Sequence, residues 1–301
     1  MIRRPVCVED TDALVRLFRS ADVAEIGRAE TSRADIADLL AAPGLDLARR
    51  SQVAIDEGDI HGLVLLHPAP RPGQLRVQLR VDSREGGGEV ARMLLALVDQ
   101  WILQGAETKP VEATVFQLPQ ALAVPQLVAS GWTIVHSYTR MKADLTRFSE
   151  APTTGEAVIR PASSEAEMAT VHAVLEEAND GHWNHQRQSF DDFLSDQQHR
   201  DGHDPSLWLL AFVADQPAAA LIARAPADRA WIAWLGTLPQ YRGKGLATEL
   251  LTTAFTELHR RGHSSVGVDV DTYNETHAGD VYQRAGMTIL GTADQWRKTY
   301  C

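Results

Sequence analysis

The chain has 301 residues, of which 44% are hydrophobic and 23% charged, and its formal net charge is −11. These ordinary globular values exclude a collagen-like, coiled-coil or largely disordered chain. An acidic chain is a poor binder of nucleic acid, because affinity for nucleic acid comes largely from neutralising phosphates. We therefore expect a globular protein with no nucleic-acid partner.

The apolar stretches and the cysteines narrow the class of protein further. The longest apolar runs, such as Leu207–Ala214, fall far short of the about 20 residues that a membrane helix needs. Met1–Pro5 leads into acidic residues without an apolar leader, and Cys7 and Cys301 stand at opposite ends. We expect a cytoplasmic protein, monomeric or homodimeric, with no membrane partner, no disulfide framework and no metal site.

The first half of the chain predicts two amphipathic helices and a strand. Apolar residues at helical spacing over 13–18 indicate the first helix. Gly86–Gly88 forms a turn that opens a second helix, whose apolar stripe runs from Val90 to Trp101. Gly131–Val135 then begins a strand.

The second half predicts the same succession of elements. The expected elements are a helix over 168–175, a hairpin of Leu207–Ala214 and Ala218–Arg224, a strand over Arg229–Leu238, a helix over Leu246–Arg261 that Gly262 ends, a strand over Val266–Val270 and a short helix over Thr276–Ala285. In the last of these strands, valines alternate with Asp269 and Asp271. This alternation predicts one apolar and one acidic face.

The two halves share sequence blocks in the same order. Arg4-Pro5 returns as Arg160-Pro161, Gly86–Gly88 as Gly243–Gly245, and Gly131–Val135 as Gly286–Leu290. Each block recurs after about 156 residues, a period that indicates duplicated domains rather than a short repeat. We place the two domains at 1–148 and 157–301, joined near Ser149–Glu156, where Pro, Thr and Gly cluster.

The segment Arg242–Ala247 carries the clearest chemical signal. Gly243 and Gly245 let the backbone approach an anion closely, and the free N–H groups of a helix start attract one. Arg242 and Lys244 add positive charge. The spacing matches neither nucleotide-binding pattern, G-x-x-x-x-G-K-[ST] or G-x-G-x-x-G. On the glycines alone, an anion site and a merely tight turn into the helix both stay open.

This segment resembles the arginine-x-x-glycine-x-alanine signature of the GNAT acyltransferase superfamily. The strand before it, Leu235–Pro239, stands where the family has one, and Ala278–Met287 is similar to the family's A-x-x-[LV]-Y-x-x-x-G-[FM] ending. The resemblance covers the second copy nearly end to end and, through the repeat, the first. Tandem copies of this kind resemble mycothiol synthase and its relatives.

The resemblance implies an α/β fold of two tandem GNAT-like domains. Each would have a central, mixed and mostly antiparallel twisted sheet flanked by helices (α+β). It also implies acetyl-CoA, or another short acyl-CoA, as co-substrate and a primary amine of a small molecule as acceptor. The acetyl group would pass to the amine by direct attack, and the second domain would be the catalytic one.

The resemblance also assigns the residues that hold the co-substrate. Its pyrophosphate would meet the turn formed by Arg242, Gly243, Lys244, Gly245, Leu246 and Ala247. Its pantetheine arm would pair with the backbone of Leu235, Gly236 and Thr237 like an added strand, and Asn274 would contact that arm.

Acylation of an amine needs an acid and a base. By the resemblance, Tyr282 is the acid that protonates the departing thiolate, and its alternative role is that of a core tyrosine. Asp269 stands where relatives carry a glutamate base, and Asp271 lies on the same face. A solvated strand face is the alternative for both. Mycothiol synthase has its glutamate on the preceding strand, where this chain has Trp231.

The first copy lacks these groups. Glu85 stands in place of Arg242, and Leu127 in place of Tyr282. A carboxylate repels a pyrophosphate and leucine has no proton to give. We expect the first domain to be degenerate and inactive as a transferase.

The segment Asn179–Pro205 of the second copy is rich in histidine and aspartate, and in this family it covers the acceptor pocket. Trp183 and Asp271 are the candidate acceptor-binding residues, because a tryptophan stacks on rings or cations and acids suit an amine. A polar surface loop is the alternative. Two other functions stay open for the whole chain: a non-catalytic acyl-CoA-binding or regulatory protein, and mycothiol synthase proper.

Overall fold

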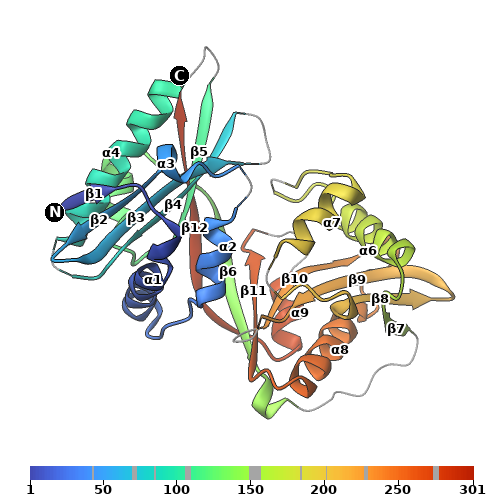
Figure 1. Cartoon of the computed structure of the whole chain (residues 1–301). Helices are drawn as coiled ribbons and strands as arrows, with labels where there is room; N and C mark the ends of the chain where they lie inside the picture. Colours follow the sequence, from blue (N-terminus) through green and yellow to red (C-terminus); the bar gives the residue numbers. More distant parts are fainter. Residues whose placement is uncertain are drawn as a thin grey trace. The chain divides into compact units, whose positions relative to one another are not determined.

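A computed structural model describes residues 1–42, 44–69, 73–84, 86–105, 110–148, 157–183, 185–200, 202–226, 230–273 and 278–301. The chain divides into two compact units (Figure 1). Unit 1 comprises Met1–Tyr138 and Thr292–Cys301, and unit 2 comprises Thr139–Gly291. The expected linker Ser149–Glu156 lies outside the described residues.

Unit 1 contains five strands and five helices among its described residues. They are β1 (Ile2–Arg4), β2 (Ser51–Asp56), β3 (Asp59–Pro68), β4 (Gln74–Val81), β5 (Val111–Gln117), α1 (Thr11–Ile26), α2 (Arg33–Leu40), α3 (Leu47–Arg50), α4 (Gly87–Gly105) and α5 (Val124–Ala129). Two long strands, β6 (Thr133–Asp144) and β12 (Thr288–Tyr300), contribute residues to both units.

The described part of unit 2 has five strands of its own and four helices. They are β7 (Val158–Pro161), β8 (Trp208–Val213), β9 (Gln216–Arg224), β10 (Ala230–Thr237), β11 (Ser265–Asp271), α6 (Glu165–Ala178), α7 (Phe190–Gln198), α8 (Leu246–Arg260) and α9 (Ala278–Arg284).

Each unit is built on a mostly antiparallel sheet. The order in unit 1 is β1-β2-β3-β4-β5-β12-β6, with β4 and β5 parallel. The order in unit 2 is β12-β6-β11-β10-β9-β8-β7, with β10 and β11 parallel. These sheets with their flanking helices confirm the predicted α/β fold class.

The compact units differ from the predicted domains, 1–148 and 157–301, in their last strands. In unit 1, β5 pairs with β12, the final strand of the second repeat, from Gln117↔Asp294 to Val111↔Tyr300. In unit 2, β11 lies next to β6, the final strand of the first repeat. The repeat spacing assigns each segment to a copy of the sequence, but the partner of a strand depends on pairing that spacing does not report.

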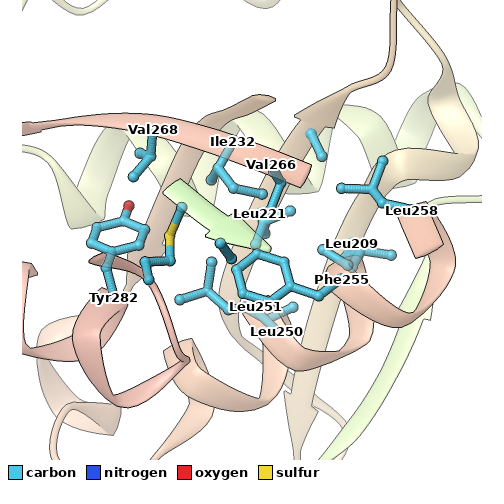
Figure 2. Close-up of a cluster of buried hydrophobic side chains, with 14 of the residues drawn as sticks. Leu209, Leu221, Ile232, Leu250, Leu251, Phe255, Leu258, Val266, Val268 and Tyr282 are labelled. Carbon is cyan, nitrogen blue, oxygen red and sulfur yellow. The ribbon is translucent and has the colours of Figure 1, made fainter. Parts of the chain in front are cut away.

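The core of unit 2 follows from the alternation of side chains along its strands. Leu209 and Leu221 face α8 and α9 on one side of the sheet, in the cluster drawn in Figure 2. Trp208 and Ile222 face α6 and α7 on the other side. A sheet covered on both faces holds its strand ends rigidly, which is what a site at those ends requires.

Most predicted elements of the second copy are confirmed. The hairpin forms between β8 and β9, and its turn residues Ala214 and Asp215 have φ of 47° and 61°. The helix α8 ends one residue earlier than predicted, and Gly262 beyond it adopts φ of 91°. Among the described helices, none combines the length and apolar character needed to cross a bilayer.

Both copies of the repeat begin with an equivalent arginine–carboxylate ion pair, which joins an edge strand to the start of the first helical segment. Arg4 pairs with Asp10 at 2.6 Å in unit 1, and Arg160 pairs with Glu167 at 2.6 Å in unit 2. The hydrogen bonds from these arginines lower the pKa of Asp10 and of Glu167 to about 2. The repeat in sequence is therefore also a repeat of local chemistry.

Candidate active site

The two parallel strands of unit 2 stop pairing soon after they meet. Among the described residues, the pairs are Ala230↔Val266 and Trp231↔Gly267, although β10 continues to Thr237 and β11 to Asp271. The pairing of β10 with β9 shifts register between Ile232 and Trp234 at the same level, which marks a β-bulge at Ala233. Beyond the bulge, the edge of β10 that faces β11 is left without a partner strand in the described part of unit 2.

Gly236 on this unpaired stretch lies very close to the end of α6. A Cβ atom at Gly236 would lie 2.7 Å from the Cβ of Ala178 and 3.5 Å from the side-chain nitrogen of Asn179. No other residue fits this close approach without displacing the helix. The glycine therefore brings the C-terminus of α6 onto the exposed edge of β10.

The glycine turn that leads into α8 is open. Gly243 and Gly245 have φ of 77° and 81°, a region that favours glycine, and a Cβ at either position would meet nothing within 4 Å. Gly245 is the N-cap of α8 and no side chain caps the helix; its carbonyl accepts from the amide of Glu249. The first amides of the helix, from Leu246 onward, have no intrahelical partner and can bind an anion.

The two cations of the turn have different contacts. The Arg242 side chain donates from Nε to the carbonyl of Thr237 at 3.2 Å and from Nη2 to the carbonyl of Ala178 at 3.0 Å. It thus joins the end of β10 to the end of α6 and the turn. Lys244 Nζ lies 5.4 Å from the ring centre of Tyr241. We interpret Arg242 as a residue that positions the site, in addition to supplying charge.

Tyr282 lies on α9 in the core beside Val268 of β11, and its hydroxyl is on the side of Val268 in Figure 2. Its side chain is only 7% exposed, and burial raises the pKa of Tyr282. In the described part of the chain, no hydrogen bond reaches this hydroxyl. A tyrosine in this setting keeps its proton at neutral pH, as an acid that awaits a thiolate must.

Asp269 has a partner that the sequence did not suggest. Arg140 donates from Nε to Oδ1 at 2.8 Å and from Nη2 to Oδ2 at 3.0 Å. The same guanidinium lies 5.5 Å from the ring centre of Trp231, and that ring occupies the space that a Cβ at Gly267 would need. A carboxylate held by a bidentate arginine has fewer lone pairs with which to accept a proton. Arg140 was missed because it lies 129 residues away in the sequence.

Three further residues were predicted to belong to the site: Asp271, Trp183 and Asn274. Asp271 ends β11, half-buried, and its Oδ1 accepts from the amide of Tyr273 at 2.8 Å. Trp183 is 43% exposed. Asn274 lies outside the described residues.

The acidic residues of the predicted acceptor segment are largely paired with arginines. Asp180 pairs with Arg187 at 3.1 Å, Asp196 with Arg200 at 3.2 Å and Asp204 with Arg261 at 2.6 Å. Asp192 accepts from the Ser189 hydroxyl that caps α7. These pairs reduce the negative field that we expected to attract an amine. Over the ranges that the structure covers, no group of three or more His, Cys, Asp or Glu is arranged to hold a metal ion.

Unit 2 thus combines a splayed pair of parallel strands, an open glycine turn at a helix start and a buried tyrosine on α9. Residues 171–287 match the sequence model of the acetyltransferase (GNAT) family. The sequence of this part of the chain is therefore similar to GNAT acetyltransferase domains. In a search of curated proteins, no sequence matched the chain.

Solved structures extend the likeness of fold to nearly the whole chain. A GCN5-related N-acetyltransferase from Sphaerobacter thermophilus is 23% identical, with a TM-score of 0.84 over 99% of this chain and 95% of that one. A tandem GNAT protein from the clavulanic acid biosynthesis pathway is 17% identical, with a TM-score of 0.69 over 99% and 98%. The glucosamine N-acetyltransferase region of a fungal multi-domain β-N-acetylglucosaminidase is 16% identical, with a TM-score of 0.68 over 99% of this chain and 38% of that chain. The predicted resemblance to GNAT proteins, including tandem ones, is confirmed.

Proposed function

We propose that this protein is an acetyl-CoA-dependent N-acetyltransferase whose second unit transfers the acyl group to a primary amine of a small molecule. The observation that carries this proposal is the unpaired edge of β10, which runs from the bulge at Ala233 towards the open turn at Gly243–Gly245. An extended chain with amide groups and a diphosphate at one end fits such an edge followed by such a turn.

Each part of the co-substrate has a counterpart in unit 2. The pyrophosphate would accept hydrogen bonds from the amides of the turn, from Gly243 to Ala247. The amides of the pantetheine arm would pair with the backbone of Leu235–Thr237. A thioester carbonyl beside the bulge at Ala233 would accept from a backbone N–H of β10, which stabilises the oxyanion formed during attack.

The chemistry then needs one new bond and one broken bond. The amine nitrogen attacks the carbonyl carbon, the C–S bond breaks, and the Tyr282 hydroxyl protonates the departing thiolate. Direct attack is favoured over an acyl-enzyme, because both cysteines lie in unit 1. The Cys7 thiol donates a hydrogen bond to Asp10 and accepts one from Arg4, and Cys301 is exposed at the end of the chain. No cysteine is therefore placed in unit 2 to serve as a nucleophile.

The alternative of mycothiol synthase proper is disfavoured by the surroundings of Trp231. That side chain, which stands where mycothiol synthase has a glutamate, packs on Gly267 and beneath Arg140. No carboxylate of β10 can therefore act as a base there.

The test is to mix the protein with acetyl-CoA and a panel of amines and to measure the release of free thiol. The panel includes spermidine, lysine, glucosamine and a cysteinyl pseudodisaccharide. Glucosamine is chosen because one structural neighbour contains a glucosamine N-acetyltransferase region. Thiol release above hydrolysis supports the proposal. Binding of CoA without release for any amine would favour a non-catalytic, acyl-CoA-binding protein, and release with the pseudodisaccharide alone would favour mycothiol synthase.

A further inference from the structure

The carboxylate of Asp269 lies level with the position that we propose for the thioester. In the described part of unit 2, the last pair between the splayed strands joins Trp231 to Gly267. Both strands run in the same direction, so Asp269 stands two residues beyond this pair on β11, as the bulged Ala233 does on β10. At about 3.3 Å per residue, each lies about 7 Å past the pair. Asp271, two residues further on, is level with the stretch given to the pantetheine arm.

Asp269 shares one face of the sheet with Trp231 and with Arg140 of β6. Each of these three residues has a neighbour in the core around Tyr282 on the opposite face (Figure 2), namely Val268, Ile232 and Met141. Because side chains alternate along a strand, the three point to the face that α6 and α7 cover. The core fills the opposite face at this level, so an acceptor amine approaches the thioester from the face of Asp269.

Arg140 engages both groups that line this approach. Its Nε and Nη2 donate to the two carboxylate oxygens of Asp269 at 2.8 and 3.0 Å. Its guanidinium also lies 5.5 Å from the ring centre of Trp231. The side chains of Arg140 and Asp269 are 31% and 34% exposed, so the pair is accessible to an incoming molecule. A bidentate arginine neutralises a carboxylate and uses the lone pairs with which it would take up a proton.

The site therefore offers little to a protonated amine. The aspartates of the acceptor segment that pair with Arg187, Arg200 and Arg261 add no strong negative field. An ammonium group would lose water at the approach without gaining a free counter-charge or a base. An alkylamine such as the lysine side chain, with a pKa of about 10.4, is unprotonated in fewer than about one molecule in 1,000 at pH 7.

We propose that the acceptor is a weakly basic primary amine, such as an arylamine or an amine beside an electron-withdrawing group, and that Arg140 sets this preference as the positioning residue that holds Asp269; this inference rests on the proposed function. The amine arrives unprotonated, and its lone pair attacks the thioester carbonyl. As the C–S bond breaks, the nitrogen of the adduct loses one proton to solvent. Tyr282 protonates the thiolate and regains a proton from solvent, so that amide and free thiol result.

The first experiment measures kcat/KM of the wild type for two pairs of amines of similar size, ethylamine with trifluoroethylamine and cyclohexylamine with aniline. The first member of each pair is strongly basic and the second weakly basic. For the strongly basic amines, kcat/KM should rise about tenfold per pH unit from about pH 7 to about pH 9, because it follows the unprotonated fraction of the amine. For the weakly basic amines it should stay constant. Tyr282 keeps its proton over this range, since burial raises its pKa.

The second experiment releases Asp269 from its arginine. Arg140→Met keeps an unbranched side chain beside Trp231 but removes the donors to both carboxylate oxygens. We expect kcat/KM for ethylamine at neutral pH to rise between about tenfold and about 100-fold, as Asp269 begins to act as a base, and that for trifluoroethylamine to change less than about threefold. The rise with pH for ethylamine should flatten. Arg140→Lys, which retains a cation, should change the ethylamine rate less.

Arg260→Met is the matched control, because Arg260 also forms a bidentate pair, with Glu257 on the exposed side of α8. It should leave both rates unchanged. The affinity for CoA, measured by calorimetry, checks that each variant is folded. If Arg140→Met loses that affinity, Arg140→Lys carries the comparison, and an unchanged ratio of the two rates in it contradicts the role of Arg140.

The outcomes separate this inference from the proposed function. If the wild type acetylates any strongly basic amine, spermidine and lysine included, at a kcat/KM that stays level from pH 7 to pH 9, the enzyme removes the proton itself. The substrate class is then wrong and the proposed function stands. Turnover of strongly basic amines alone, or an equal response of both amines to Arg140→Met, also overturns the inference. If no amine is acetylated, the proposed function fails, and the inference fails with it.

Discussion

The two units share a succession of elements, yet positions that we propose for binding in unit 2 serve packing in unit 1. Among the described residues, the parallel strands β4 and β5 of unit 1 form four pairs, from Gln74↔Glu112 to Val77↔Val115, against two between β10 and β11 in unit 2. No register shift interrupts the pairing of β4 with β3. Beyond the last pair, the side chain of Gln117 donates to the carbonyl of Leu79 at 2.9 Å. The edge of β10 beyond the bulge has no partner strand in the described part of unit 2, whereas the equivalent edge of β4 is hydrogen-bonded to the side chain of Gln117.

Arg80 stands second from the end of β4, as Gly236 does in β10. Gly236 leaves room for the end of α6. The guanidinium of Arg80 instead forms ion pairs with Glu25 at 2.8 Å and with Asp22 at 3.4 Å. It also lies 5.4 Å from the ring centre of Phe18. In unit 1 an ion-pair cluster therefore occupies the position at which the end of α6 packs in unit 2.

The glycine turns are alike at their first position, because a Cβ at Gly86 of unit 1 or at Gly243 of unit 2 would meet nothing within 4 Å. They differ at the middle position, where a Cβ at Gly87 would lie 2.5 Å from the carbonyl oxygen of Asp82 and 2.9 Å from the side chain of Leu122, and where unit 2 has Lys244. Leu127, which replaces Tyr282, is fully buried. Glu85 lies outside the described residues. The comparison teaches that an open glycine turn is not enough for activity, and the leucine at position 127 supports our proposal that unit 1 is inactive.

The largest effect is expected at the acid. Tyr282→Phe keeps the packing of the ring in the core but removes the proton donor, so the maximal rate of acyl transfer should fall about 100-fold or more. The affinity for CoA should change little. Steady-state rates and calorimetry measure the two quantities. Tyr300→Phe in unit 1, which loses a bond to Asp99, is the control, and an unchanged rate for Tyr282→Phe would show that another group is the acid.

The ion-pair cluster of unit 1 should matter for stability alone. Arg80→Met leaves the buried carboxylates of Asp22 and Glu25 without their cation. Burial already raises the pKa of Glu25, and Arg80 opposes that shift. We expect the free energy of unfolding to fall by about 2 kcal/mol, less than for a fully buried pair because the guanidinium is partly exposed. Denaturant unfolding measures it. A change in the affinity for CoA would contradict the division of roles between the units.

The turn of unit 2 should respond to a single methyl group. Gly245→Ala places a Cβ in the open space before α8 at a φ of 81°, and we expect the affinity for CoA to fall about tenfold, with about 1 kcal/mol lost from stability. Gly262→Ala and Gly86→Ala carry the same backbone penalty, because both have positive φ and open surroundings. These controls should lose stability but bind CoA normally. Equal loss of affinity in Gly86→Ala would indicate that unit 1 also binds the ligand.

The smallest effect is expected where the units are alike. The pKa of Asp10 lies near 2 in the folded protein because of Arg4 and near 3.9 in an unfolded chain. The stability from this pair is therefore present above about pH 4 and is lost as the pH falls towards 2. Asp10→Asn should lower the free energy of unfolding by about 1 kcal/mol or less at pH 7 and by clearly less at pH 2, where the Asp10 carboxyl of the folded protein is partly protonated. Glu167→Gln should behave in the same direction, and opposite signs would show that the two ion pairs are not equivalent.

Much of the fold and part of the site could be predicted from the sequence. The apolar stripes of the helices, the valines of β11 and the repeated glycine blocks depend on local periodicity, which a sequence displays directly. The turn before α8 and Tyr282 were found because their signals are short and continuous. The degenerate character of the first copy was predicted at Leu127 for the same reason.

Contacts between distant segments could not be read in this way. The partner of Asp269 is Arg140, from a strand of the first repeat that lies beside β11, and that contact occupies both oxygens of the predicted base. Other contacts also depend on tertiary structure. They are the pairs of aspartates and arginines in the acceptor segment, the contact of Glu176 with His185 and the hydrogen bond from Gln117 to the carbonyl of Leu79. Local sequence determined which elements form and which groups are chemically able to react. Tertiary structure decided which of those groups have partners, because strand pairing and ion pairing join residues whose separation along the chain carries no periodic signal.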